Sequence, residues 1–220
     1  MDTINSSLAE ALNRVRSLPS SEPQSDEELA NRRRRHLIAR CWRQADVPAR
    51  FDECRLETSP HHGLAADLAR ADQGASYYLY GPVGTGKTGL AAGYLRTWIE
   101  RTLRPALFVT APRMFSELRS TYNGAELSEI AIIDRYAQIP LLVLDDLGSE
   151  GFKSQDWLSD RLYQILGERH DELLPTVITS NLSLHELSDR VGERITWRIA
   201  EACGPGNIIQ VKGRNLREPQ

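Results

Sequence analysis

From Asp46 onward, short apolar runs alternate with longer stretches in which apolar residues recur at helical spacing. The short runs predict five strands. These are expected at Ser76–Tyr80, Ala106–Thr110, Leu141–Leu144, Thr176–Thr179 and Asn207–Val211. Apolar strands that are each followed by a helix are typical of a mainly parallel five-stranded sheet flanked by helices. The predicted fold class is therefore α/β.

The longer stretches predict the helices between these strands. They are expected at Lys87–Leu103, Pro112–Thr121, Leu127–Ala137, Gln155–Leu173 and Leu184–Ala202. Gly192 lies inside the last of them, which either runs through this glycine or breaks near it.

The pattern before Asp46 is different and predicts a short helical extension. Leu8, Leu12, Val15 and Leu18 favour an amphipathic helix over Ser7–Leu18, and the proline- and serine-rich stretch Pro19–Asp26 favours a flexible linker. A second helix is expected from Asp26, its N-cap, to Gln44. Its run Arg32–Arg35 is either a solvated face or a surface for a partner or nucleic acid. The expected division is an N-terminal, partner-docking extension over 1–45 and a main domain over 46–220.

Composition narrows the class of protein. The 220 residues carry a formal net charge of -3, so any contact with nucleic acid must come from a local basic patch. No apolar run approaches the length of a membrane span, and the first residues lack a signal-peptide pattern. The three cysteines show no C-x-x-C pairing. We therefore expect a cytoplasmic protein with reduced thiols and no membrane partner.

The most informative segment is the G-x-x-x-x-G-K-T loop Gly81-Pro82-Val83-Gly84-Thr85-Gly86-Lys87-Thr88. It follows a predicted strand and opens a predicted helix, the context that a phosphate-binding loop requires. Glycines let backbone N–H groups surround phosphates, and the helix adds the positive end of its dipole. Lys87 would reach the β- and γ-phosphates of ATP, and Thr88 would bind Mg²⁺. The alternative is a glycine-rich turn without a ligand.

A second signature is the apolar run Leu141–Leu144 followed by Asp145 and Asp146. The carboxyl ends of parallel strands form the edge where ligands bind. Asp145 would hold the magnesium ion, and Asp146 would polarise an attacking water. The alternative, two acids that cap the next helix, does not account for their combination with Lys87 and Thr88.

Asn181 follows the strand Thr176–Thr179 and would orient water against the γ-phosphate. The alternative role for its amide is to cap the helix that starts near Leu184. Further on, Arg190, Arg194 and Arg198 are spaced i, i+4, i+8, which places them on one face if the helix is continuous. They are either solvated surface or arginines that neutralise charge on the γ-phosphate of a neighbouring molecule.

These segments together resemble the DnaC/DnaI-type bacterial replicative helicase loaders, which are AAA+ ATPases. The resemblance rests on Gly81–Thr88, Leu141–Glu150, Thr179–Leu182, Gly192–Ile199 and Gly213–Arg217. IstB-type transposition helpers share much of this core. The stretch Val47–Phe51 also resembles the segment before the loader core, and we prefer the loader on that basis. The resemblance covers roughly Asp46 to Arg217 and implies a P-loop NTPase fold of AAA+ type.

The resemblance also implies roles for single residues. Asn181 would be the sensor-1 residue, Arg194 and Arg198 would be the conserved-box arginines with Arg198 as the finger in trans, and Arg217 would be sensor 2. The tail reads Asn215-Leu216-Arg217 where the family commonly has Ser-Tyr-Arg, and Asp146 stands where many AAA+ enzymes have glutamate. The second departure implies slow hydrolysis.

The function implied is an ATPase that self-associates with ATP bound, grips single-stranded DNA and delivers a replicative hexameric helicase. Hydrolysis would be stimulated by assembly or DNA and would release the loader. Arg113, Arg119, Tyr122 and Asn123 would either contact DNA or form ordinary surface. Two rival functions stay open, a transposition helper on duplex DNA and a nucleotide-gated adaptor with incidental hydrolysis. A small-molecule P-loop kinase would have no need for Asn181 and the arginine-rich tail.

Overall fold

A computed structural model of the chain describes residues 26–71, 74–121, 128–149 and 155–216. The chain divides between Leu37 and Ile38 into two units, which are taken separately. The helix α2 (Asp26–Gln44) has the bounds expected from the sequence. The helix expected at Ser7–Leu18 lies outside the described residues, and the domain division at 45/46 stays a prediction.

The second unit is built on one sheet of five parallel strands in the order β2-β3-β4-β1-β5. The strands are β1 (Tyr77–Tyr80), β2 (Ala106–Thr110), β3 (Leu141–Leu147), β4 (Thr176–Ser180) and β5 (Ile208–Gln210). The predicted α/β class is therefore confirmed. β3 continues to Leu147 rather than ending at Leu144, because Leu147 pairs with Ser180 after a register shift.

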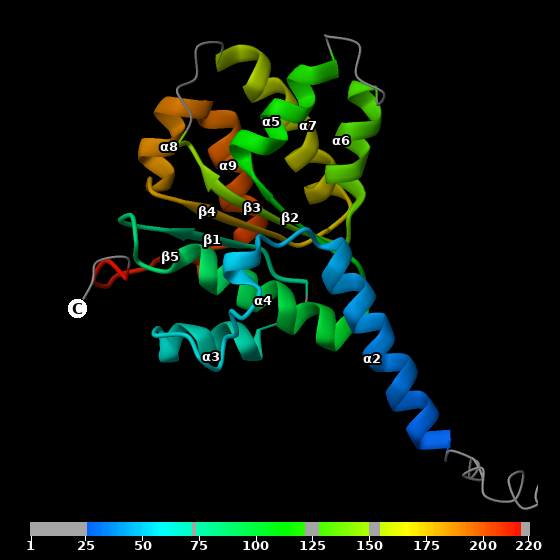
Figure 1. The fold of residues 1–220 in the computed structure, drawn as a ribbon. Helices are drawn as coiled ribbons and strands as arrows, with labels where there is room; N and C mark the ends of the chain where they lie inside the picture. The colour runs from blue at the N-terminus through cyan, green and yellow to red at the C-terminus, as the bar shows by residue number, and fades with distance from the viewer. Residues whose placement is uncertain (1–25, 72–73, 122–127, 150–154, 217–220) are drawn as a thin grey trace, which may run out of the picture. The chain divides into compact units, whose positions relative to one another are not determined.

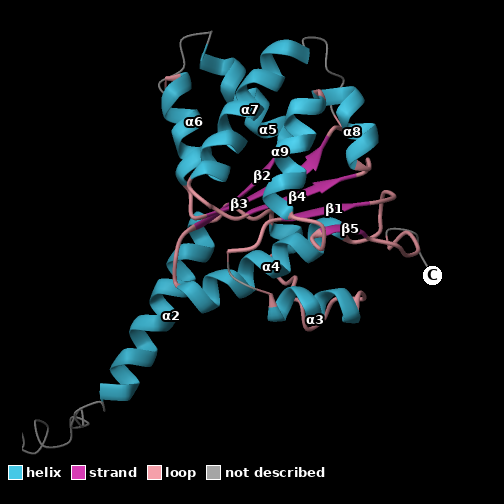
Figure 2. Cartoon of the chain, turned by 180° about the vertical axis from the view of Figure 1, so that it is seen from behind, coloured by secondary structure: helices cyan, strands magenta, loops and turns pink. Residues whose placement is uncertain are grey.

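Helices cover both faces of the sheet (Figure 1, Figure 2). One face carries α3 (His62–Arg70) and α4 (Lys87–Thr102), with the short 3-10 helix η1 (Ala49–Phe51) against α4. The other carries α5 (Ala111–Ser120), α6 (Glu129–Gln138), α7 (Gln155–Asp171), α8 (Leu184–Val191) and α9 (Glu193–Cys203). Successive strand side chains enter opposite cores, as Tyr77 and Tyr78 do. This two-sided burial explains the continuous apolar strands in the sequence.

The structure adds one helix to the sequence-based expectation and decides between the two alternatives for another. The helix α3 was missed, although Leu64, Ala65 and Leu68 repeat at helical spacing. The expected helix Leu184–Ala202 breaks at Gly192, whose φ of 92° ends α8 and lets α9 begin. Because of this break, Arg190 does not share a helix face with Arg194 and Arg198.

A buried arginine links α7 to the ends of α6 and β4. Arg169 is 1% exposed, and its guanidinium donates to the carbonyl oxygens of Tyr136, Ala137, Ile139 and Pro175 and to the Thr176 hydroxyl. Burial lowers the pKa of Arg169 to about 9, which leaves the group protonated at neutral pH. Arg169 thus satisfies carbonyl groups that the end of α6 leaves without helical partners.

None of the helices within the described ranges is both long and apolar enough to cross a membrane.

Candidate nucleotide-binding site

The loop between β1 and α4 follows a course that only glycines permit without strain. Gly81, Gly84 and Gly86 have φ values of 142°, 83° and 90°. A Cβ added at Gly81 would lie 2.5 Å from the carbonyl oxygen of Val211, so the neighbouring chain also excludes a side chain there. Gly86, the N-cap of α4, offers no side-chain hydrogen bond to the first turn. The N–H groups at this helix end are therefore suited to bind an anion.

Lys87 lies inside the loop rather than in solvent. Its ammonium group donates to the carbonyl oxygens of Gly81 and Pro82, both at 2.8 Å, and to Asn181 Oδ1 at 2.9 Å. The residue is only 7% exposed. A buried ammonium that is held by neutral oxygens interacts strongly with an anion that enters beside it.

Asp145 is a buried carboxylate at the end of the central strand β3. Its Oδ1 accepts a hydrogen bond of 2.7 Å from the Thr179 hydroxyl. Burial raises the pKa of Asp145, while hydrogen bonds from Thr179 and Thr88 act in the opposite direction. The neighbours of Asp145 therefore stabilise its negative charge only in part, and a bound cation would stabilise it further. Together with Thr88 it offers oxygen ligands of the kind that Mg²⁺ prefers, so these residues fit the ion.

Asp146 lies at the register shift in the pairing of β3 with β4. Its φ is 60°, in the left-handed region, and its N–H donates 2.9 Å to the Thr179 hydroxyl oxygen. Its carboxylate accepts from Asn181 Nδ2 at 3.2 Å. Thr179 therefore binds both acids, a role that the sequence did not reveal. A non-glycine residue in this region is strained, and such strain clusters at functional sites.

These groups meet at one cavity of about 610 Å³. From the predicted site, the residues that line it are Val83, Gly84, Gly86, Lys87, Thr88, Asp145, Asp146 and Asn181. Arg50 and Phe51 of η1 and the segment around Cys54 form another part of its wall. Gly81, Pro82 and Thr85 instead shape the loop, through their carbonyl bonds to Lys87 and His61 and the bond from the Thr85 hydroxyl to Pro82.

Two contacts to the loop have no signature in the sequence. His61 Nε2 lies 2.5 Å from the carbonyl oxygen of Thr85. The N–H of Leu216 donates to the carbonyl oxygen of Gly84 at 2.8 Å, and Leu216 also lines the cavity. These residues are far from the loop in the chain, and only the fold brings them there. Arg217, the expected sensor 2, lies outside the described residues.

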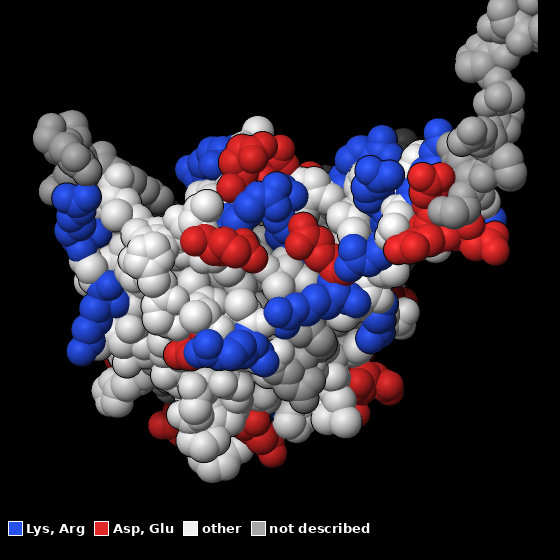
Figure 3. Space-filling model, turned by 90° about the horizontal axis from the view of Figure 1, so that it is seen from below, with Lys and Arg blue, Asp and Glu red and all other residues white. Residues whose placement is uncertain are grey.

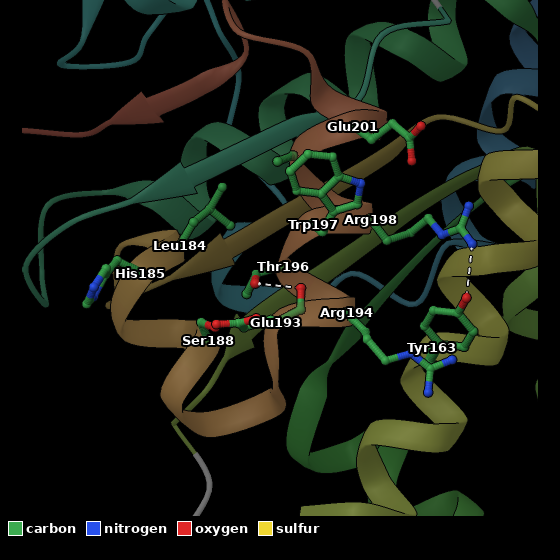
Figure 4. Close-up of a pocket in the computed structure, with 11 residues that line it drawn as sticks. Tyr163, Leu184, His185, Ser188, Glu193, Arg194, Thr196, Trp197, Arg198 and Glu201 are labelled. Carbon is green, nitrogen blue, oxygen red and sulfur yellow. Dashed lines mark hydrogen bonds between the residues drawn. The ribbon is translucent and has the colours of Figure 1, made fainter.

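Arg194 and Arg198 line a different cavity, of about 700 Å³, together with Tyr163 and Trp197 (Figure 4). None of these four residues lines the cavity at Lys87, Asp145 and Asn181, which is called the nucleotide cavity below. The two arginines on α9 therefore do not join Lys87 and Asp145 within one copy of the chain.

The candidate DNA contacts are only partly described. Arg113 forms ion pairs with Asp46 at 2.6 Å and with Glu117 at 3.1 Å, whereas Arg119 is exposed. Tyr122 and Asn123 lie outside the described residues. On the face that carries α3 and α4, basic and acidic side chains are interspersed (Figure 3), as in the pair Arg70–Asp67. DNA contact at these positions stays a prediction.

Comparison with known proteins identifies the family of this chain. The model of the IstB-like ATP binding proteins matches residues 22–217. The chain belongs to the family of IstB-like ATP-binding proteins. The predicted relation to IstB-type proteins and helicase loaders is thereby confirmed, and ATP binding is the property that the family's description carries.

Two relatives of this IstB-like chain represent different kinds of protein. The replicative helicase loader DnaI of Bacillus subtilis is 28% identical over 197 residues, which cover 83% of the chain and 60% of DnaI. The protein Rv3427c of an insertion sequence in Mycobacterium tuberculosis is 28% identical over 188 residues, which cover 82% of the chain and 73% of that relative. The chain thus spans about three fifths of the length of DnaI.

A solved structure supports the fold. The crystal structure of the DnaC helicase loader superposes with a TM-score of 0.64 at 24% identity, covering 75% of the chain and all of that structure. At this identity the likeness concerns the fold, which is the predicted AAA+ type of P-loop NTPase.

Proposed function

We propose that this chain is an ATP-dependent loader of a replicative hexameric helicase that binds single-stranded DNA and is released by ATP hydrolysis. The observation that carries the ATPase part is the convergence of Lys87, Asp145, Asp146 and Asn181 on one cavity. The loader part is supported by the likeness to DnaI over most of the chain.

Each residue of the cavity has a distinct task in this mechanism. Lys87 exchanges its bonds to Gly81 and Pro82 for phosphate oxygens, and the loop N–H groups bind the remaining phosphate charge. Thr88 and Asp145 would hold Mg²⁺, which when bound offsets the negative charge of the phosphates. Asp146 accepts a proton from the attacking water, and Asn181 orients that water.

The arginines of α9 act on a neighbouring copy. Arg194 and Arg198 are absent from the walls of their own nucleotide cavity, and Arg194 is exposed while Arg198 is half-buried. An arginine can serve phosphoryl transfer only if it approaches the γ-phosphate. In an ATP-bound assembly, the α9 surface of one copy therefore faces the cavity of the next, with Arg198 as the finger. ATP hydrolysis then depends on the association of subunits.

The first alternative is a transposition helper that assembles on duplex DNA. It is supported by the IstB family model and by the likeness to Rv3427c, of which the chain covers a larger share than of DnaI. The second alternative is a nucleotide-gated adaptor, in which ATP binding alone orders a partner surface. Function that survives an Asp146→Asn substitution would favour the adaptor.

Binding measurements separate these functions. With ATP present, fluorescence anisotropy compares labelled single-stranded and duplex DNA, and co-purification tests the replicative helicase of the same organism. A loader prefers single strands, binds the helicase through residues 1–45, and loses both interactions on Lys87→Ala substitution. Preference for duplex DNA, without helicase binding, would contradict the loader and favour the transposition helper.

A further inference from the structure

The helices α7 and α9 pack together beside the sheet. α9 buries Ile195, Ile199 and Cys203 in the core, whereas Trp197 is 75% exposed. Arg194 and Arg198 are one turn apart and therefore lie on the same side of α9. Figure 4 shows that both side chains extend toward Tyr163 on α7.

Tyr163 contacts both guanidinium groups. The Arg194 guanidinium carbon lies 4.4 Å from the centroid of the tyrosine ring, and that of Arg198 lies 5.5 Å from it. Arg198 Nη2 also donates to the Tyr163 hydroxyl at 3.2 Å. The pKa of this hydroxyl is lowered, first by the hydrogen bond from Arg198 and then by the nearby guanidinium group of Arg194. One aromatic side chain therefore holds two cations.

Other contacts of Arg198 are weaker. Its Nη1 lies 3.8 Å from Asp171 Oδ1, and the Asp171 side chain is 71% exposed. A salt bridge of this length to an exposed carboxylate restrains an arginine little. Long side chains lose rotamer freedom when they are fixed, and a planar ring offers guanidinium groups a stacking surface that does not neutralise them. The arginines stay cationic and yet ordered.

We propose that Tyr163 is a positioning residue for the arginine pair, fixing Arg194 and Arg198 in the direction in which they meet the γ-phosphate of a neighbouring copy. This inference rests on the proposed function, since it needs hydrolysis in trans. Tyr163 does not line the nucleotide cavity of its own copy, because it lines the cavity formed by Arg194, Trp197 and Arg198 of α9. Its effect is transmitted through the two guanidinium groups.

Two substitutions distinguish the contribution of the Tyr163 hydroxyl from that of its aromatic ring. Tyr163→Phe removes the bond to Arg198 and keeps the stacking surface, so kcat for ATP falls by about twofold to fivefold. Tyr163→Leu removes both, and kcat falls by about tenfold to thirtyfold. The Kd for ATP stays at the wild-type value in both variants. The graded loss in kcat at constant ATP affinity is the first expected result.

A mixing experiment shows on which copy Tyr163 acts. Asp146→Asn subunits retain Tyr163 and both arginines, but hydrolyse ATP poorly. When they are added to Tyr163→Leu subunits, they supply ordered arginines, and turnover per Tyr163→Leu subunit rises toward the wild-type value. The same addition to Arg198→Ala subunits gives the reference for complete rescue in trans.

The outcomes distinguish this inference from the proposed function. If Arg198→Ala leaves turnover unchanged, hydrolysis in trans fails, and the role of Tyr163 fails with it. If Arg198→Ala lowers turnover and is rescued while Tyr163→Leu is at the wild-type level, only the positioning role is overturned. A Tyr163→Leu defect that Asp146→Asn subunits do not rescue also overturns it, because the defect then lies in the variant's own fold.

Discussion

The ammonium group of Lys87 and the side-chain oxygen of Asn181 are joined by a hydrogen bond of 2.9 Å across adjacent parallel strands, since Lys87 follows β1 and Asn181 follows β4. The amide nitrogen of Asn181 donates to Asp146, so the asparagine connects the phosphate-binding loop to the acids of β3. Asn181 therefore contacts the groups that would hold the phosphate and the group that would activate water.

Asn181→Ala is expected to lower kcat for ATP by about a hundredfold, the effect of removing one well-placed donor from a reacting centre. The Kd for ATP should change little, because Lys87 keeps its position and charge. Steady-state hydrolysis and nucleotide titration check this. Asn207→Ala, the same change outside the cavity, should leave both values unaltered; equal defects in the two variants would contradict a role of Asn181 in hydrolysis.

Asp145→Asn is expected to stabilise the nucleotide-free protein while abolishing hydrolysis. Because burial raises the pKa of Asp145, its charged form costs stability above that raised pKa, and the cost disappears below the ordinary value of 3.8. At neutral pH the melting temperature should rise by about 2 to 4 °C, the shift that about 1 kcal/mol produces in a domain of this size.

The gain in melting temperature from Asp145→Asn should shrink to a small fraction when thermal melts are repeated near pH 3.5, because the wild-type carboxyl is then mostly protonated in the unfolded state, and more so in the folded state, where its pKa is raised. A gain that persists unchanged at that pH would mean that the charge of Asp145 is not its cause.

Gly84→Ala is expected to destabilise the loop, because φ is 83° and the new Cβ would lie 1.8 Å from Asn215 Oδ1. The strained backbone alone costs about 1 to 3 kcal/mol. Chemical denaturation measures this loss. Gly167→Ala is the matched control, since it is helical with no heavy atom within 4 Å of the added Cβ, and it should add about 0.5 to 1 kcal/mol of stability.

The double variant Gly84→Ala/Asn215→Ala removes the collision with Asn215 and keeps the unfavourable φ. It should recover only part of the lost stability. Full recovery would show that the contact with Asn215, and not the backbone conformation, makes glycine necessary at this position.

Arg169→Lys is expected to lower the free energy of unfolding by about 3 kcal/mol, because one ammonium cannot reach the acceptors on both α6 and β4 and leaves buried carbonyl groups unpaired. Urea denaturation checks the value. Arg101→Lys, at an exposed position of α4, should stay within about 0.5 kcal/mol of the wild type. An equally small change in the free energy of unfolding for Arg169→Lys would contradict the role of the Arg169 guanidinium in linking α6 to β4.

The central strands and the place of the loop Gly81–Thr88 between β1 and α4 could be predicted because their signals are local. Gly81–Thr88 combines the required glycines with a lysine, and apolar runs such as Leu141–Leu144 can only be buried. The site residues Lys87, Asp145 and Asn181 were placed together by one rule, that parallel strands end at the same edge of a sheet.

Other parts of the site depend on contacts between distant segments, which no local pattern encodes. Thr179 was given no role at the site from the sequence, yet its hydroxyl binds both acids of β3. His61 and Leu216 reach the loop from distant parts of the chain. Tyr163 resembles any other tyrosine of an amphipathic helix until α9 packs beside α7.

The most direct test of the account is ATP turnover per subunit as a function of protein concentration, with and without single-stranded DNA, for the wild type, Arg198→Ala and Arg101→Ala. Arg101 is the matched control because it is an exposed arginine on α4, away from α7 and α9. We predict that wild-type and Arg101→Ala turnover rises with concentration and DNA. Arg198→Ala should bind ATP normally and lose about a thousandfold in kcat. ATP turnover that does not change with protein concentration, DNA or the Arg198→Ala substitution would contradict hydrolysis in trans. The protein would then be a monomeric nucleotide switch.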